Sequence, residues 1–418
     1  MVSKKFDWEN GVVLEDHTKK KHDVVREYFR QYLITRCQLP QQERFRLAVI
    51  DGFSGGGLYR CGNLGSPLIF LDVLKNTTNE INISRSSQGL RPIQIECLLI
   101  LNDASPSAIK LLRENIAPHL AEAKDKSQYL HVAVEYSVGN FEKVYPSIRT
   151  RLKSGRCGNN VFFNLDQGGY SQVTVKIIQD IVNVWKSAEV ILTFMIGSLL
   201  AYLSPNRDSS GVPLDPEIHS KIYALLEDDN VILEKKEWLG EAEQIVYSHL
   251  KGCAAYITPF SINNPNGWRY WLMHFANAHH ARRVFNNVLH ADNSTQAHFG
   301  RAGLHMLSYD PKKAEGQLYL FDGNSRESAK IALYEDIPRL VAECGDAIAV
   351  QEFYAIAYSE TPAHSEDIHD VIIQNPDLQV VTGSGGERRK PNTIRASDTL
   401  KLKSQRSLIF MFSGSREE

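Results

Sequence analysis

Short apolar runs recur along the first half of the chain, and each ends in a polar or glycine-containing turn. The runs lie at residues 47–50, 95–101, 131–136, 160–165 and 188–196. Segments with apolar residues at helical spacing separate them, and a first helix is predicted before them, over residues 14–37. Strands that alternate with helices are typical of a parallel, doubly wound α/β sheet.

The pattern changes after the fifth run. Residues 198–252 are predicted to form a mostly helical insertion. Two strand-like runs follow at 256–262 and 268–276, and the turn sequence NNPNG between them predicts an antiparallel hairpin, with a helix after it. Five parallel strands finished by an antiparallel hairpin are the layout of class I S-adenosylmethionine-dependent methyltransferases. Residues 1–310 are therefore predicted to form a Rossmann-like domain of this type.

The remaining chain predicts a second domain. Residues 311–324 are polar and are predicted to be a linker. Three helical stretches follow at 325–344, 350–358 and 365–374, and then a strand at 378–381, a basic loop and a closing strand at 408–412. Three helices and a hairpin with a basic loop predict a winged helix-turn-helix domain over residues 325–418.

Composition places the chain among soluble globular proteins. Of its 418 residues, 43% are hydrophobic and 23% are charged, and the net charge of −2 means that any nucleic-acid contact must come from a local patch. The six cysteines are scattered without zinc or iron–sulfur spacing, so no metal site is predicted and a reducing cytosol is expected. No apolar run is long enough for a membrane span, and the expected location is the cytoplasm.

A glycine-dense loop follows the first strand, in the sequence DGFSGGGLY at residues 51–59. Glycines let a ligand approach the main chain closely, and ligands of open α/β sheets bind at the carboxyl ends of strands. The loop is expected to contact the methionine portion of S-adenosylmethionine through five residues: Asp51, Gly52, Phe53, Gly55 and Gly57.

The next strands also end in residues suited to that cofactor. Asp103 is expected to accept hydrogen bonds from the ribose hydroxyls, and Asn140 and Phe141 to contact the adenine. Asp166 follows the fourth strand and is expected at the transfer site, where it orients or deprotonates a substrate amine or hydroxyl while Tyr170 stacks on the substrate. Asp103 lies 52 positions after Asp51 instead of about 20, and a polar loop predicted over residues 76–92 accounts for the excess.

Two basic features are candidates for contact with anions. His17 and Lys21 stand near the start of the first helix, which is expected to be a solvated basic end; because cations there oppose the helix dipole, a bound phosphate or carboxylate is the alternative. Near the C-terminus, a patch predicted to bind nucleic acid, with DNA favoured, contains Arg388, Arg389, Lys390, Arg395, Lys401 and Lys403. The third helix of the same domain carries Glu366, Asp367 and Asp370, which would repel a phosphate backbone.

The chain closely resembles the family of three-Cys-motif partner proteins (TcmP). The likeness extends over essentially the whole chain, and the matching motifs are EDHTKKKH at 15–22, DGFSGGGLY at 51–59 and GSPLIFL at 65–71. The family's fourth strand usually ends in an Asp-Pro-Phe-Gly-Tyr-like motif, whereas this chain has Asp166-Gln167-Gly168-Gly169-Tyr170, without the Pro-Phe pair. The resemblance implies a methyltransferase-like domain, a winged helix and a separate three-Cys-motif partner that looks like a radical S-adenosylmethionine protein.

Three functions remain open at this stage. The first is a methyltransferase that acts on nucleic acid, or on a target bound to it, together with the three-Cys-motif partner. The second is a non-catalytic scaffold that holds this partner on DNA. The third, minor one is a serine hydrolase, since Gly52-Phe53-Ser54-Gly55-Gly56 fits G-x-S-x-G. Its triad would have Ser54 as nucleophile, Asp166 as acid and His274, His279 or His280 as base. Cytosine-C5 methylation is disfavoured because no cysteine follows the fourth strand.

Overall fold

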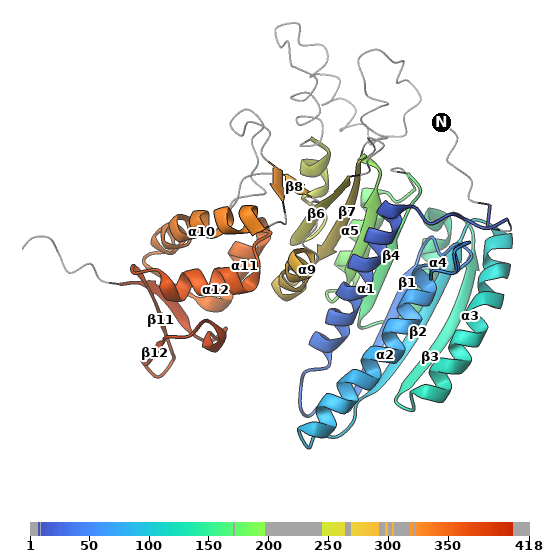
Figure 1. Ribbon diagram of the computed structural model, residues 1–418, viewed down its shortest axis with the longest axis horizontal. Helices are drawn as coiled ribbons and strands as arrows, with labels where there is room; N and C mark the ends of the chain where they lie inside the picture. The colour runs from blue at the N-terminus through green and yellow to red at the C-terminus, as the bar shows by residue number, and fades with distance from the viewer. Residues whose placement is uncertain are drawn as a thin grey trace, which may run out of the picture.

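The computed structural model describes most of the chain outside residues 197–244. The described residues are 7–8, 10–169, 172–196, 245–263, 269–291, 297–299, 303–304, 318–320 and 323–403. They form a large α/β sheet domain and a smaller C-terminal domain beside it (Figure 1).

The main sheet has nine strands in the order β3-β2-β1-β4-β5-β7-β6-β8-β9. Their bounds are β1 (Arg44–Asp51), β2 (Gln94–Asp103), β3 (Leu130–Val138), β4 (Val161–Leu165), β5 (Glu189–Phe194), β6 (Tyr256–Asn263), β7 (Arg269–Ala276), β8 (Ala297–Phe299) and β9 (Leu318–Leu320). The first five strands are parallel, and β7 runs antiparallel to both β5 and β6. The predicted doubly wound Rossmann-like sheet with an antiparallel hairpin is confirmed, but the sheet does not end there, because β8 and β9 continue it beyond β6.

Helices cover both faces of this sheet. They are α1 (Asp16–Arg36), α2 (Ser66–Ser87), α3 (Pro106–Lys126), α4 (Phe141–Ser154), α5 (Val175–Val184) and α9 (His279–Ala291). Strand β1 shows why both faces need cover, because its side chains alternate between two apolar cores. Leu47 and Val49 pack with residues of α1, α2 and α3, whereas Ala48 and Ile50 pack with residues of α4 and α5.

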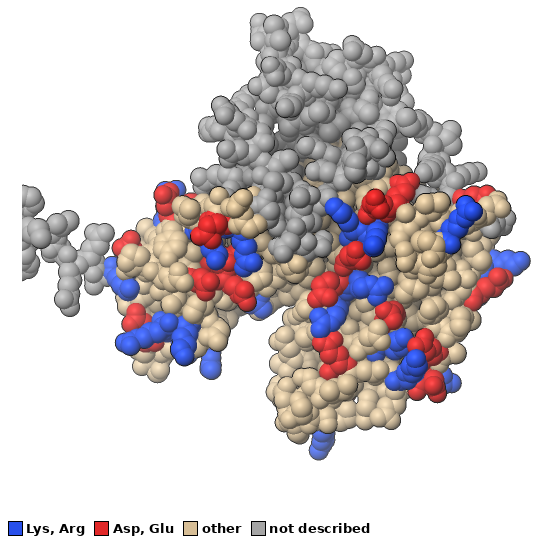
Figure 2. Space-filling view, in the orientation of Figure 1, with Lys and Arg blue, Asp and Glu red and all other residues tan. Residues whose placement is uncertain are grey.

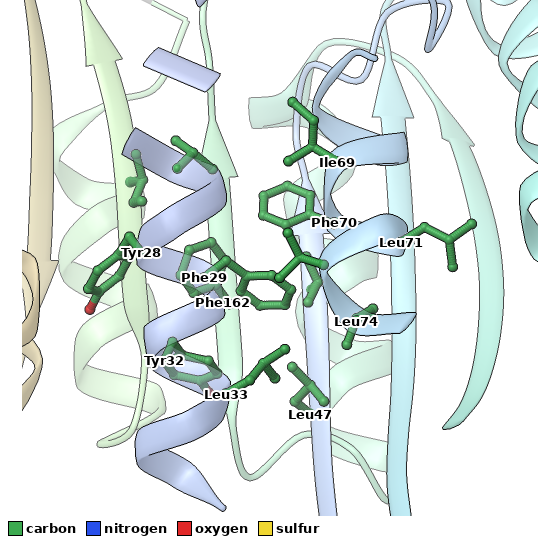
Figure 3. Packing of buried hydrophobic residues seen from close by; sticks show 14 of the residues in the cluster. Tyr28, Phe29, Tyr32, Leu33, Leu47, Ile69, Phe70, Leu71, Leu74 and Phe162 are labelled. Atoms are coloured by element: carbon green, nitrogen blue, oxygen red, sulfur yellow. The ribbon is translucent and has the colours of Figure 1, made fainter. Parts of the chain in front are cut away.

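The core beneath α1 is built from aromatic rings. Phe162 of β4 lies between Phe29 of α1 and Phe70 of α2, with ring centroids 5.2 and 5.8 Å away (Figure 3). All three side chains are fully buried. Helix α1 precedes the sheet in sequence, and these rings fix it across the strands, with its N-terminal end near their carboxyl ends (Figure 1).

The polar loop predicted over residues 76–92 is wrong, because α2 continues to Ser87. Most polar residues there form the solvent face of a long helix, but Thr77, Thr78 and Arg85 are buried, and Arg85 has a structural role. The Arg85 guanidinium is buried and donates to the main-chain oxygens of Leu39, Pro40, Gln42 and Arg91. It thereby holds the connection between α1 and β1 against the end of α2.

The C-terminal domain has its own core and a second, antiparallel sheet. Its elements are α10 (Gly323–Glu343), β10 (Ala347–Ala349), α11 (Val350–Glu360), α12 (Ser365–Gln374), β11 (Leu378–Val381), β12 (Glu387–Arg388) and β13 (Thr399–Leu402), with strand order β10-β13-β11-β12. The three predicted helices and the strand at 378–381 are confirmed, and β13 was not predicted. The predicted strand at 408–412 lies outside the described residues, as does most of the predicted insertion at 198–252. Strand β9 falls inside the predicted linker.

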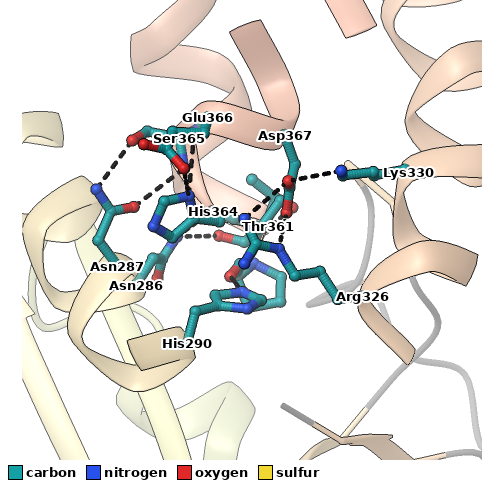
Figure 4. A network of polar contacts seen from close by, with 12 residues as sticks. Asn286, Asn287, His290, Arg326, Lys330, Thr361, His364, Ser365, Glu366 and Asp367 are labelled. Atoms are coloured by element: carbon teal, nitrogen blue, oxygen red, sulfur yellow. Dashed lines mark hydrogen bonds and ion pairs between the residues drawn. The ribbon is translucent and has the colours of Figure 1, made fainter. Parts of the chain in front are cut away.

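Helix α9 joins the two domains through main-chain oxygens of the segment between α11 and α12. The buried Arg282 donates to the carbonyls of Ile257 (2.9 Å) and Thr361 (3.0 Å). Asn286 donates to the Thr361 carbonyl, and the His290 ring bonds the Pro362 carbonyl at 2.9 Å (Figure 4). These buried bonds attach the C-terminal domain to the main sheet.

Candidate functional site

Polar side chains meet at the carboxyl ends of β1, β4 and β5. Asp51 ends β1 and lies next to Asn164 of β4 in the sheet register. It is fully buried, and its Oδ1 accepts from the Asn164 amide at 3.3 Å and the Phe53 N–H at 3.4 Å. Burial raises the pKa of Asp51 to about 7, although hydrogen bonds from Ser66, Phe53 and Asn164 lower it in part. Asp51 can therefore gain or lose a proton near neutral pH.

Asp166 directly follows β4 at the same edge of the sheet, and it pairs with a lysine from α1. The Lys21 Nζ lies 2.5 Å from its Oδ1, and the Thr193 hydroxyl of β5 bonds the same carboxylate. Burial is the largest single influence and raises the pKa of Asp166, but the charge of Lys21 and the hydrogen bonds from Lys21 and Thr193 together outweigh it, so the net pKa is lowered. The Lys21 side chain is 8% exposed and that of Asp166 is 25% exposed, so solvent reaches the pair from the side of Asp166.

His22, next to Lys21 on α1, completes this polar cluster. Burial, followed by the charge of Lys21, lowers the pKa of His22 to about 4, so its imidazole is neutral at physiological pH. A cavity of about 10 Å³ lies between these groups and is lined also by Ser66 and Asn164. This volume suits about one water molecule.

His17 and Lys21, the two candidate anion contacts, take different positions. Lys21 binds a carboxylate of the chain itself, Asp166. His17 is buried and stacks on Tyr270 of β7, with ring centroids 4.4 Å apart and an angle of 12° between the rings. The packing of α1 on the sheet therefore explains why these two basic residues stand near the start of the helix.

Asp103, the predicted ribose ligand, lies at the end of β2 beside the glycine loop. Its Oδ2 accepts from the Gly55 N–H at 2.9 Å, and its Oδ1 accepts from the Ser105 N–H at 2.8 Å. Gly55 has a φ of +58°, in the left-handed region that glycine adopts readily. A carboxylate has about four acceptor positions, so Asp103 holds the loop and keeps capacity for further donors.

The sequence analysis missed Trp8, which lies against this loop. A Cβ atom on Gly55 would overlap the Trp8 ring, and one on Gly56 would come within 2.9 Å of it. Gly52 is packed as tightly against other side chains, because a Cβ atom added there would lie 2.8 Å from Leu165 and 2.9 Å from Phe141. Packing within the protein thus requires glycine at these positions, independently of any ligand.

The two phenylalanines predicted as cofactor contacts belong largely to the core. Phe141 is 1% exposed, and its ring lies 5.9 Å from that of the half-buried Phe53. Asn140, at the start of α4, is exposed and free to meet a ligand. Gly57, with a φ of +83°, faces Leu112 of α3. Tyr170 lies outside the described residues.

Ser54 does not have the surroundings of a nucleophile. Its side chain is 3% exposed, and its hydroxyl donates to the Asp51 carbonyl at 3.0 Å, which stabilises the turn. Asp166, the predicted acid of that triad, pairs with Lys21. His274, one candidate base, is fully buried beside Tyr28 and Glu189. The geometry disfavours the serine hydrolase.

The predicted basic patch of the C-terminal domain is only partly available to a ligand. Arg388 forms a two-point ion pair with the buried Asp398, at 2.9 and 3.2 Å. The remaining cations are Arg389, Lys390, Arg395 and Lys403, which are exposed, and Lys401, which is half-buried. Lys and Arg side chains gather on this domain over the end that carries β11 and β12 (Figure 2).

The acidic residues of α12 are less repulsive than their number suggests. Asp367 is buried and pairs with Arg326 at 2.6 Å and Lys330 at 3.3 Å, both on α10 (Figure 4). Its charge is therefore neutralised inside the domain. Glu366 is exposed and Asp370 is half-buried.

Two further properties concern the described part of the chain as a whole. It holds no group of three or more His, Cys, Asp or Glu side chains arranged to bind a metal ion. Among its helices, none has the length and apolar character needed to cross a bilayer.

Comparisons with known proteins give distant structural likenesses only. No known protein family and no curated protein matches the chain. One similar solved structure is an O-methyltransferase-type protein from Klebsiella pneumoniae, with 12% identity, a TM-score of 0.26, and coverage of 65% of this chain and 94% of that one. Another is the O-methyltransferase TomG from Streptomyces achromogenes, in complex with SAM, with 14% identity, a TM-score of 0.25, and coverage of 64% and 92%. At such TM-scores, the fold assignment rests on the strand order described above.

We predict that Asp51 lowers the stability of the protein as the pH rises. Its pKa is about 7 in the folded state and 3.8 in the unfolded chain, so only the folded protein keeps this proton between about pH 4 and pH 7. Stability is thus lost across this window, by up to about 4 kcal/mol. The variant Asp51→Asn has no titratable group at this position. Urea unfolding should therefore show that its stability rises relative to that of the wild type as the pH rises. Parallel pH profiles for the two proteins would contradict the prediction.

We predict that Lys21→Met destabilises the protein by about 2 kcal/mol, because it leaves the Asp166 carboxylate without its cation in a largely buried position. The double variant Lys21→Met, Asp166→Asn should recover most of this loss, since no charge then remains unpaired. Urea unfolding of the wild type, the two single variants and the double variant measures this coupling. Additive losses in the double variant would show that the pair is not coupled.

Proposed function

We propose that the chain is an S-adenosylmethionine-binding protein of the methyltransferase type, with its transfer site at the polar cluster of Lys21, His22, Asp51, Asn164 and Asp166. The observation that supports this most is the convergence of three carboxylates on one edge of a Rossmann-like sheet. Asp51, Asp103 and Asp166 follow or end strands β1, β2 and β4, which are adjacent in that sheet. Ligands of open α/β sheets bind at this edge.

Asp103 and the main chain of the Gly52–Gly57 loop would hold the cofactor. The Asp103 carboxylate faces the loop and keeps acceptor capacity for ribose hydroxyls, and the exposed Asn140 lies at the end of the next strand, where the adenine would extend. Trp8 lies on the loop, so its indole reports on anything that binds there. The bound cofactor supplies an activated methyl group.

Asp166 would position the acceptor of that methyl group. Lys21 keeps its carboxylate ionised, and an ionised carboxylate accepts hydrogen bonds from an amine or a hydroxyl. Asp51, with a pKa of about 7, is a buried neighbour of Asp166 that can take up a proton. Tyr170 remains the proposed stacking residue.

The C-terminal domain is proposed to be a winged helix that binds nucleic acid, with DNA favoured. Its order of three helices and an antiparallel sheet, with the β11–β12 hairpin as the wing, supports this assignment. The exposed Arg389, Lys390 and Arg395 would contact phosphates through the wing. The resemblance to three-Cys-motif partner proteins adds the proposal that a separate three-Cys-motif protein works with this chain at the nucleic acid.

Two observations favour a non-catalytic alternative. Lys21 and Thr193 already bind the Asp166 carboxylate, and Trp8 covers part of the glycine loop. A chain that holds its partner on DNA without transferring a methyl group would keep this fold and this packing. Cofactor binding distinguishes the two functions.

We predict that calorimetric titration of S-adenosylmethionine into the purified chain gives micromolar binding and changes the Trp8 fluorescence. Asp103→Ala should lower the affinity at least about tenfold, because it removes the acceptor of the ribose hydroxyls. Asp125→Ala, which removes an exposed acidic residue near the end of α3, is the matched control and should bind normally. Absence of binding to the wild type would leave the scaffold as the better function.

We predict that the triple variant Arg389→Ala, Lys390→Ala, Arg395→Ala weakens DNA binding. The dependence of its affinity on salt concentration should also become shallower, by the equivalent of about three phosphate contacts. A matched control removes three exposed lysines of the other domain, Lys110, Lys153 and Lys186. Arg388→Ala should leave the salt slope unchanged, because Arg388 is already paired with Asp398. Equal losses in the triple variant and its control would exclude the wing as the contact. Affinity measured by fluorescence anisotropy over a range of salt concentrations decides this.

A further inference from the structure

Strand β3 forms a long free edge of the main sheet. It pairs with β2 along all nine of its residues and stands last in the strand order, with no further strand beside it in the part of the chain that the structure describes. The Tyr129 carbonyl and the Gly139 N–H bond β2, so the odd-numbered residues of β3 pair inward. The main-chain groups of Val132, Val134 and Tyr136 therefore face the open edge.

This edge lacks the features that usually prevent strands from pairing between molecules. Natural edge strands are short, bulged, or interrupted by Lys or Pro. The sequence of β3, LHVAVEYSV, contains neither residue, and its register with β2 is unbroken. A groove of about 1210 Å³ lies along it, bordered by Leu120 and Ala121 of α3 and by Arg151 of α4. The strand is thus available to another strand.

We propose that β3 pairs antiparallel with β3 of a second copy of this chain, about a two-fold axis at Ala133. Residues that face the edge must pair with residues that face it in the partner, so the axis falls on Ala133, Val134 or Glu135. An axis at Glu135 brings two carboxylates opposite each other, and an axis at Val134 pairs no opposite charges.

The axis at Ala133 is favoured by hydrogen-bonding groups and by size. It sets the His131 imidazole opposite the partner's Glu135 carboxylate, which can accept a hydrogen bond from it, once on each side of the axis. It also brings the smallest side chain of the strand to the axis, where directly opposed residues that are not hydrogen-bonded approach most closely. His131 and Ala133 are exposed, and Glu135 is half-buried and paired with Arg151 of its own chain at 2.6 Å, with acceptor capacity left for a further donor.

In this register, the side chains on the other face of β3 also form matching pairs with those of the partner. Val132 comes opposite the partner's Val134, and Leu130 comes opposite the partner's Tyr136. These are apolar pairs of the kind that stabilise neighbouring strands. The sheet then continues across the axis, with the two polar clusters on opposite edges of it.

The test is the mass of the full chain in solution, measured by sedimentation over a wide range of protein concentration. The wild type should show twice the chain's 47.2 kDa. His131→Glu, which places carboxylates opposite one another, and Ala133→Lys, which places cations at the axis, should give monomers. His131→Lys keeps a hydrogen-bond donor opposite the carboxylate and should stay dimeric. A wild type that is monomeric throughout, or a dimer that survives both disrupting substitutions, overturns the proposal.

Covalent trapping tests the register separately from stability. Ala133→Cys places two sulfurs across the axis, where opposed Cα atoms lie at a separation that suits a disulfide, and should give a covalent dimer without reductant. Val138→Cys, exposed at the end of the same strand, lies far from the axis and should trap no more dimer than the wild type. Equal trapping by the two variants would reject the axis at Ala133.

Discussion

The ion pair between Lys21 and Asp166 is the interaction on which the candidate site depends. Lys21 comes from α1, which precedes the whole sheet in sequence, and Asp166 comes from the end of β4, 145 positions later. The pair can form only because aromatic packing fixes α1 across the strands, with Phe29 against Phe162. The fold therefore places a cation beside the carboxylate before any substrate is present. That cation keeps the pKa of Asp166 low, while Asp51, without one, has a raised pKa.

Much of the sheet domain was predictable because its strands are buried on both faces. Such strands appear as continuous apolar runs, and the polar residue that ends each run marks the carboxyl edge. Asp51, Asp103 and Asp166 were found in this way. The same reasoning failed for α2, because polar residues at helical spacing on a solvent face look like a loop when the buried positions include Thr77, Thr78 and Arg85.

Other parts of the site could not be predicted because they depend on contacts between distant segments. Asn164 becomes important through its register with Asp51, and Trp8 through its position on the glycine loop. The only local signal for Asn164 was its place on β4, two residues before Asp166, which directly follows that strand. Charge counting also misjudged the C-terminal domain, where Asp398 neutralises Arg388 and α10 neutralises Asp367. Net charge along the sequence does not distinguish a paired charge from a free one.

The junction at α9 has a consequence for how the two domains can evolve. Arg282, Asn286 and His290 bind carbonyl oxygens at 361–363, and every residue has a carbonyl oxygen. On this side of the junction, the side chains of α9 therefore determine almost all of these bonds. Positions 362 and 363 are buried, so a substitution there keeps these bonds only where the new side chain still packs and the backbone keeps its course. A different C-terminal domain could bond the same helix only if it offered a turn of similar shape and a surface that packs on Tyr256 and His279.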